Sequence, residues 1–103
     1  IHVMDVVEAN MYALGWLFNQ SQVLEEFNIC TGQATSVKVA ANSFRKVSEQ
    51  RIEQQIVAAR SGDVAALVGN ASKAKEILKW QSKRTVEDIA TDAWRFYQLL
   101  RPQ

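Results

Sequence analysis

The chain has 103 residues, of which 48% are hydrophobic and 22% charged, a composition typical of one ordinary globular domain. Its formal net charge of +1 gives no overall field that would favour nucleic acid or an anionic membrane. The chain has a single cysteine, which excludes an intrachain disulfide, and a single histidine, so the two together supply too few ligands for a Cys/His zinc site. No apolar run reaches the ~20 residues of a membrane span. These features predict a soluble protein of a reducing compartment.

The first third of the chain predicts a helix followed by a strand. Apolar residues recur at helical spacing over about residues 4–18, with Asp5 as the cap: Val7, Met11, Leu14 and Phe18. Residues 19–22 form a polar break. Residues 26–30 alternate in the manner of a strand and lead into a turn at Thr31-Gly32.

The middle third predicts a second helix, a second strand and a loop. Ser36 is the expected cap of the helix, which carries Val37, Ala40, Phe44 and Val47 on one face. Residues 51–58 favour a strand, with a helix as the alternative. The loop at residues 60–63 precedes a short apolar segment at 65–68, which ends at Gly69-Asn70.

The last third predicts two helices. Ser72 caps a short one that ends near Trp80, and Thr85 opens the other with Asp88 three residues on, a capping-box pattern. The stripe of the last helix is Ile89, Ala93, Phe96 and Leu100, and Pro102 follows its end. The prediction is therefore an α/β fold, a small domain of about four helices with two or three short strands that spans residues 1–103.

No self-contained active site is evident. Cys30 is expected to be a small buried hydrophobe, and His2 lies at an end that should fray. Neither can be paired with a partner for nucleophilic or acid-base catalysis. No glycine-rich phosphate loop is present. The three tryptophans are expected to pack in the core, and the basic run around the third helix is expected to be solvated: Lys73, Lys75, Lys79, Lys83 and Arg84.

The loop Arg60-Ser61-Gly62-Asp63 is the one segment that suggests a binding site. Arginine offers a fixed fork that matches phosphate oxygens, and aspartate accepts hydrogen bonds from a pair of sugar hydroxyls. Gly62 permits a tight turn that brings both side chains to the same side. The alternative is an ordinary surface ion pair, which is common and contributes little.

Several segments in order resemble the UDP-glucose 4-epimerase group of the extended short-chain dehydrogenases, at matching spacing over essentially the whole chain. They are Ile1–Asp5, Phe27–Gly32, Ser36-Val37, Arg60–Ala65, Ala71–Lys75, Leu78–Trp80 and Arg84–Asp88.

The resemblance is to the C-terminal substrate domain alone. In such enzymes a larger N-terminal domain binds NAD and carries the catalytic Ser and Tyr-x-x-x-Lys, all of which this chain lacks. The resemblance therefore implies no catalytic, cofactor-binding or metal-binding residue here, with NAD required only in an intact parent. It implies that Arg60 contacts the diphosphate of a UDP-sugar and Asp63 the ribose, while Ser61 and Gly62 shape the loop.

The chain departs from the pattern of the family at four positions. Cys30 replaces a glycine and puts the neighbouring turn in question; Leu67 replaces a Tyr or Cys near the sugar and puts sugar specificity in question. Lys79 replaces the glycine before the tryptophan, and Ser61 replaces a proline. Two alternatives stay open: a free-standing interaction module, or the same part of a related nucleotide-sugar dehydratase or epimerase.

The start at Ile1, without an initiator Met, suggests a cut inside a larger cytoplasmic protein. We therefore expect weak UDP-sugar binding and no turnover from these residues alone. We also expect self-association through apolar residues that a missing domain would cover: Ile1, Val3, Met11, Tyr12, Val64, Leu67 and Val68.

Overall fold

The computed structural model describes residues 1–21 and 23–100, which form two compact units. Among the described residues, 1–21, 23–33 and 68–85 make the first unit, and 34–67 and 86–100 make the second. Pro102, the expected stop after the last helix, lies outside the described residues.

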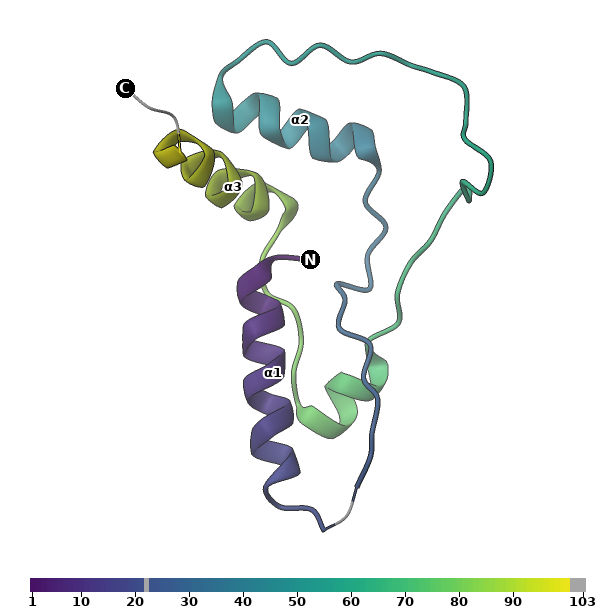
Figure 1. The fold of residues 1–103 in the computed structure, drawn as a ribbon, viewed down its shortest axis with the longest axis vertical. Coiled ribbons are helices and arrows are strands. Elements are labelled where there is room, and N and C mark those ends of the chain that lie inside the picture. The colour runs from purple at the N-terminus through teal and green to yellow at the C-terminus, as the bar shows by residue number, and fades with distance from the viewer. Residues whose placement is uncertain (22, 101–103) are drawn as a thin grey trace. The chain divides into compact units, whose positions relative to one another are not determined.

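Each unit is built from two helical segments. Helix α1 (Val3–Leu17) packs against the short π-helix η1 (Ala74–Leu78) in the first unit, and α2 (Val37–Ser48) packs against α3 (Val86–Leu100) in the second, as Figure 1 shows.

The predicted α/β class with two or three short strands is wrong, because no residue in 1–21 or 23–100 lies in a strand. Residues 26–30, which alternate like a strand, and residues 51–58, where a strand was favoured over a helix, run as irregular backbone (Figure 1). A strand forms only when its N–H and C=O groups pair with a neighbouring strand. Alternation supplies the side-chain pattern but not that partner, so the observed architecture is all-helical across the described chain.

Helix α1 confirms the first predicted helix, but its cap differs from the prediction. The Nδ1 atom of His2 accepts a hydrogen bond of 3.1 Å from the backbone N–H of Met4 and satisfies one of the free amides at the start of the helix. His2 is 3% exposed, so this end is buried rather than frayed. Asp5, the predicted cap, is fully buried and bonds elsewhere.

The second unit confirms the predicted second and fourth helices. Ser36 caps α2 as expected, since its hydroxyl accepts from the backbone N–H of Val39 at 3.2 Å. The ammonium of Lys46 on α2 lies 2.8 Å from the carboxylate of Glu87 on α3. On α3, Ala90 is fully buried, whereas Phe96 and Leu100 from the predicted stripe are exposed.

Trp80 is the centre of the core in the first unit. It is 1% exposed and packs with three small or aliphatic residues, Ala9, Ala74 and Leu78. Trp16 covers this cluster and meets Phe27 edge to face, with ring centroids 5.6 Å apart. The expected core packing of tryptophan is thus confirmed for Trp80 and holds in part for Trp16.

The predicted third helix is one short helical stretch from Ser72 that continues as the π-helix η1. Ser72 is not its cap. Instead, Oδ1 of Asn70 accepts hydrogen bonds from the backbone N–H of Ser72 (2.9 Å) and from its hydroxyl (2.6 Å). The Asn70 carboxamide therefore accepts hydrogen bonds at the start of this helical stretch, the role that was expected of the Ser72 hydroxyl.

Lys79 ends η1 in the left-handed region, with φ of +59°. Side chains with a Cβ are strained there by about 1 kcal/mol, and glycine is not. We expect Lys79→Gly to stabilise the first unit by up to about 1 kcal/mol, measured by urea denaturation. The control Lys75→Gly, inside the helical stretch, should destabilise it by about 1 kcal/mol. Equal effects of the two substitutions would contradict this account.

Candidate functional site

The loop singled out in the sequence is a tight turn that brings Arg60 and Asp63 together. The backbone N–H of Asp63 donates to the carbonyl of Arg60 at 3.1 Å, and Oδ2 of Asp63 accepts from the backbone N–H of Arg60 at 2.9 Å. Gly62 has φ of +92°, which the third residue of a type II turn requires and which glycine adopts without strain. The sequence therefore prescribes the shape of this turn.

The same turn places the two charged side chains side by side. Nε of Arg60 lies 3.6 Å from Oδ2 of Asp63, and the side chains are 88% and 44% exposed. Contact between exposed charges contributes little to stability. The backbone bond to Asp63 uses one of two carboxylate oxygens, and the guanidinium fork lies in solvent. A cation suited to phosphate and an acceptor suited to hydroxyls thus share one exposed turn.

The other predicted site residues lie on the same loop. Ser61 and Gly62 are exposed, and Leu67 is 89% exposed in the irregular segment that follows. The structure places all five predicted residues in the second unit. It brings Arg60 and Asp63 into contact, and it leaves Leu67 in solvent.

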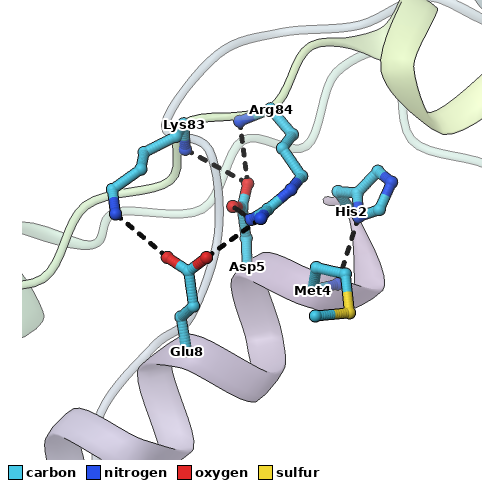
Figure 2. Close-up of polar contacts among 6 residues, drawn as sticks. All are labelled: His2, Met4, Asp5, Glu8, Lys83 and Arg84. Atoms are coloured by element: carbon cyan, nitrogen blue, oxygen red, sulfur yellow. Dashed lines mark hydrogen bonds and ion pairs between the residues drawn. The ribbon is translucent and has the colours of Figure 1, made fainter.

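A partly buried polar network that the sequence did not predict joins α1 to the segment after Trp80 (Figure 2), and Asp5 is its one fully buried member. One oxygen of Asp5, Oδ2, accepts from the backbone N–H groups of Lys83 and Arg84 at 3.1 and 3.0 Å, and Oδ1 lies 2.5 Å from the Arg84 guanidinium. Glu8, one turn along, lies 3.0 Å from the same guanidinium and 3.1 Å from the Lys83 ammonium. Two carboxylates therefore clamp one arginine.

The environment of this network shifts the pKa of both carboxylates. Burial alone would raise the pKa of Asp5, but the hydrogen bonds from Arg84 and Lys83 outweigh burial and hold it below its usual range. Hydrogen bonds from Lys83 and then Arg84 lower the pKa of Glu8. The sequence signal that could have predicted this network is the spacing of Asp5 and Glu8, three residues apart on one helix face, together with the adjacent basic pair Lys83-Arg84. Of the basic run expected to be solvated, Lys73 is also paired, with Glu25.

Among the hollows outside the loop, two concern the candidate residues and tryptophans named above. One of about 470 Å³ in the first unit is lined by Cys30, Lys75 and Trp80, among others. Gly69 is required there, because a Cβ would stand 2.7 Å from Sγ of Cys30. The other, of about 730 Å³ in the second unit, holds Trp94 stacked on Tyr97 at 5.4 Å.

The glycine spacing of the sequence and the ligand-type side chains of the described residues bear on dinucleotide and metal binding. Its four glycines stand too far apart for a phosphate-binding fingerprint. Within residues 1–21 and 23–100, no group of three or more His, Cys, Asp or Glu side chains could hold a metal ion. None of the helices in that part of the chain has the length and hydropathy that crossing a membrane requires.

Comparison with known proteins gives one consistent family. The family model described as GDP-mannose 4,6 dehydratase matches residues 1–93. UDP-glucose 4-epimerase 4 of Oryza sativa subsp. japonica is 38% identical over 96 residues, which are 93% of this chain and 26% of that protein. The bifunctional UDP-glucose 4-epimerase and UDP-xylose 4-epimerase 3 of Arabidopsis thaliana is 35% identical over 97 residues, 93% of this chain and 28% of that protein.

A solved structure agrees with these relatives. The crystal structure of UDP-glucose-4-epimerase from Stenotrophomonas maltophila, with bound NAD and formylated UDP-arabinopyranose, superposes with a TM-score of 0.90 at 32% identity. The match covers 97% of this chain and 30% of that one. The chain therefore spans under a third of the length of the relatives it matches.

Proposed function

The chain belongs to the GDP-mannose 4,6-dehydratase family, and from that membership we propose that it is the nucleotide-sugar-binding part of a UDP-glucose 4-epimerase. The relatives named above are UDP-glucose 4-epimerases, and the solved one holds a UDP-sugar derivative together with NAD. On this proposal residues 1–103 act as one UDP-sugar-binding domain of a cytoplasmic enzyme. The redox step, removal of hydride from the sugar and its return, belongs to the NAD-binding part.

The observation that carries the proposal is the turn at residues 60–63. Arg60 is assigned to the diphosphate, because its exposed fork can donate two parallel hydrogen bonds to phosphate oxygens. Asp63 is assigned to the ribose hydroxyls, because it keeps an acceptor oxygen beyond the one bonded to Arg60. Ser61 and Gly62 set the turn, and Leu67 is assigned to the wall beside the sugar.

These residues indicate the identity of the bound sugar less directly than that of the nucleotide. A leucine at position 67 offers no hydrogen bond, so it discriminates between sugars by shape alone. One relative is described as acting on both UDP-glucose and UDP-xylose. We therefore propose UDP-sugars as the ligand class, with UDP-glucose and UDP-galactose as the first candidates.

Arg60→Ala should weaken the binding of UDP by about 1–3 kcal/mol, the usual contribution of a hydrogen bond to a charged group. Isothermal titration of the 103-residue chain with UDP measures this loss. Binding of the unchanged chain should itself be weak, because an exposed loop gains little from phosphate contacts alone.

Arg51→Ala is the matched control. Arg51 is also in the second unit, 89% exposed, and its guanidinium lies 3.5 Å from the Glu53 carboxylate. This substitution removes the same charge but should leave the affinity for UDP unchanged. If Arg60→Ala and Arg51→Ala behave alike, the role assigned to Arg60 is wrong.

The 103 residues alone should not interconvert UDP-glucose and UDP-galactose when NAD is added. The chain contains neither a glycine fingerprint for the cofactor nor a Tyr-x-x-x-Lys pair to move the proton. A coupled assay for UDP-glucose formed from UDP-galactose tests this. Any turnover above background would show that the chain carries its own catalytic machinery.

We further propose that the chain associates with itself. The apolar residues expected to drive association are all exposed, from 44% at Ile1 and 68% at Val3 to 89% at Leu67. Exposed apolar side chains in such number favour an interface.

A further inference from the structure

A hollow of about 470 Å³ lies within the first unit, among segments that are far apart in the sequence. Its wall consists of residues 30–32, 68–72 and 80–82, together with Lys75 of η1. All of these residues belong to the first unit, so the hollow is formed inside one compact body. Small-molecule sites have volumes of roughly 300–1,000 Å³. The hollow is therefore large enough to hold a small ligand.

Of the described residues that form this wall, Lys75 alone is charged. The neighbouring cations Lys73, Lys83 and Arg84 all form ion pairs with acidic side chains. Lys75 forms no ion pair within residues 1–21 and 23–100, and no Asp or Glu among those residues contributes to the wall. The hollow thus presents one ammonium group that no carboxylate of the described chain neutralises.

The polar residues of the wall add hydrogen-bond donors. Oδ1 of Asn70 accepts from the backbone N–H of Ser72 and from its hydroxyl, which leaves the NH₂ group of the carboxamide to donate elsewhere. The side chains of Gln81 and Ser82 carry donors and have no partner within the described part of the chain. Trp80 lies in the same wall, and its buried Nε1–H also lacks an acceptor there. The wall is therefore suited to a ligand that supplies acceptor oxygens, since buried donors are rarely left unpaired.

We propose that this hollow binds a small anion that carries a carboxylate or phosphate group. The Lys75 ammonium supplies the charge, and the Asn70 carboxamide and the Ser82 hydroxyl donate to the anionic oxygens. Hydrogen bonds to charged groups are roughly twice as strong as those between neutral ones. A purely apolar cover would desolvate the ammonium without a counter-charge, which is costly, so it does not fit this wall. The proposal does not rest on UDP-sugar binding, because the turn at residues 60–63 belongs to the second unit.

Titration with inorganic phosphate, followed by ¹⁵N–¹H correlation spectra of the 103-residue chain, tests the site. The amides of Gly32, Gly69 and Ser82 should shift and saturate, whereas sodium chloride at the same ionic strength should not reproduce these shifts. Lys75→Gln should weaken phosphate binding at least about tenfold, the effect of losing one charged hydrogen bond. Lys79→Gln is the matched control, because it removes the same charge at the end of η1 from a residue outside the wall. The spectra also show whether both variants are folded.

Cys30 gives a second readout, because it is the only cysteine of the chain and lies in the wall. Phosphate at saturating concentration should slow the alkylation of Cys30 by iodoacetamide several-fold. The protection should persist in Lys79→Gln and disappear in Lys75→Gln. Intact-mass spectrometry over time measures the rate.

A parallel titration with acetate distinguishes the two anion classes. Saturable binding of either anion that depends on Lys75 supports the site and names the group it prefers. Saturation by neither anion, or equal affinities of Lys75→Gln and Lys79→Gln, would overturn it. Phosphate shifts confined to the amides of residues 60–63 and lost in Arg60→Ala would also overturn the hollow as the site, and would support the proposed function.

Discussion

Trp80→Ala is expected to lower the free energy of unfolding of the first unit by about 3–5 kcal/mol. Trp80 is the largest buried side chain of that unit, and its other core members are two alanines and one leucine. These small neighbours cannot fill the space that an indole leaves. A loss of this size is a large part of the stability of a small unit. Urea denaturation followed by far-UV circular dichroism measures it without relying on tryptophan fluorescence.

Two comparison variants separate packing from other effects of removing a tryptophan. Trp80→Phe keeps most of the apolar volume and removes the indole N–H, which has no hydrogen-bond partner within the described residues. Its cost should be well below that of alanine. Trp94→Ala, in the second unit, should leave hydrogen-exchange protection of α1 unchanged. Protection of α1 that survives Trp80→Ala would contradict the role given to Trp80.

Asp5→Ala is expected to destabilise the chain by about 2–4 kcal/mol, because it leaves two backbone N–H groups without their acceptor and the Arg84 guanidinium with Glu8 alone. The denaturant midpoint at neutral pH measures the loss. Glu53→Ala is the control, since the Glu53 side chain is 82% exposed in a surface pair, and it should change stability by less than about 0.5 kcal/mol. Similar midpoints for the two variants would show that the network of Figure 2 contributes nothing.

The same network predicts an acid-sensitive stability. The folded-state pKa values of Asp5 and Glu8 lie below their ordinary values of 3.8 and 4.5. Groups with depressed pKa values contribute fully above the unfolded values and lose their contribution as pH falls through the folded ones. Stability should therefore decline as the pH falls from just above 4.5 to below 3.8, and the decline should be shallower in Asp5→Ala. An unchanged slope would contradict the assignment.

Helices were predictable from this sequence because their signals are local. The Ser36 hydroxyl reaches an amide three residues away, and the Gly62 turn closes over four residues. The absence of strands from the described residues was not predictable, since an alternating segment such as 26–30 becomes a strand only if another segment pairs with it. The outcome depends on the rest of the fold and not on the pattern.

The buried face of α1 shows a second limit. The apolar stripe predicted for this helix is exposed, while Asp5 and Ala9 are buried; the stripe consists of Val7, Met11, Leu14 and Phe18. Asp5 contributes to this orientation of α1, because it accepts hydrogen bonds from two amides and a guanidinium that lie 78 and 79 residues away in sequence. A periodicity reading weighs hydrophobicity alone and has no access to such a distant partner.

The shape of the turn at residues 60–63 could be predicted from its sequence. The central claim is that this turn binds a UDP-sugar. An ¹⁵N–¹H correlation spectrum of the 103-residue chain, recorded during titration with UDP-glucose, tests that claim most directly. We predict saturable shifts of the amides of Gly62 and Asp63, and their loss in Arg60→Ala. Saturation with UDP-glucose that leaves these two amides unmoved, or shifts that persist in Arg60→Ala, would contradict the proposed site.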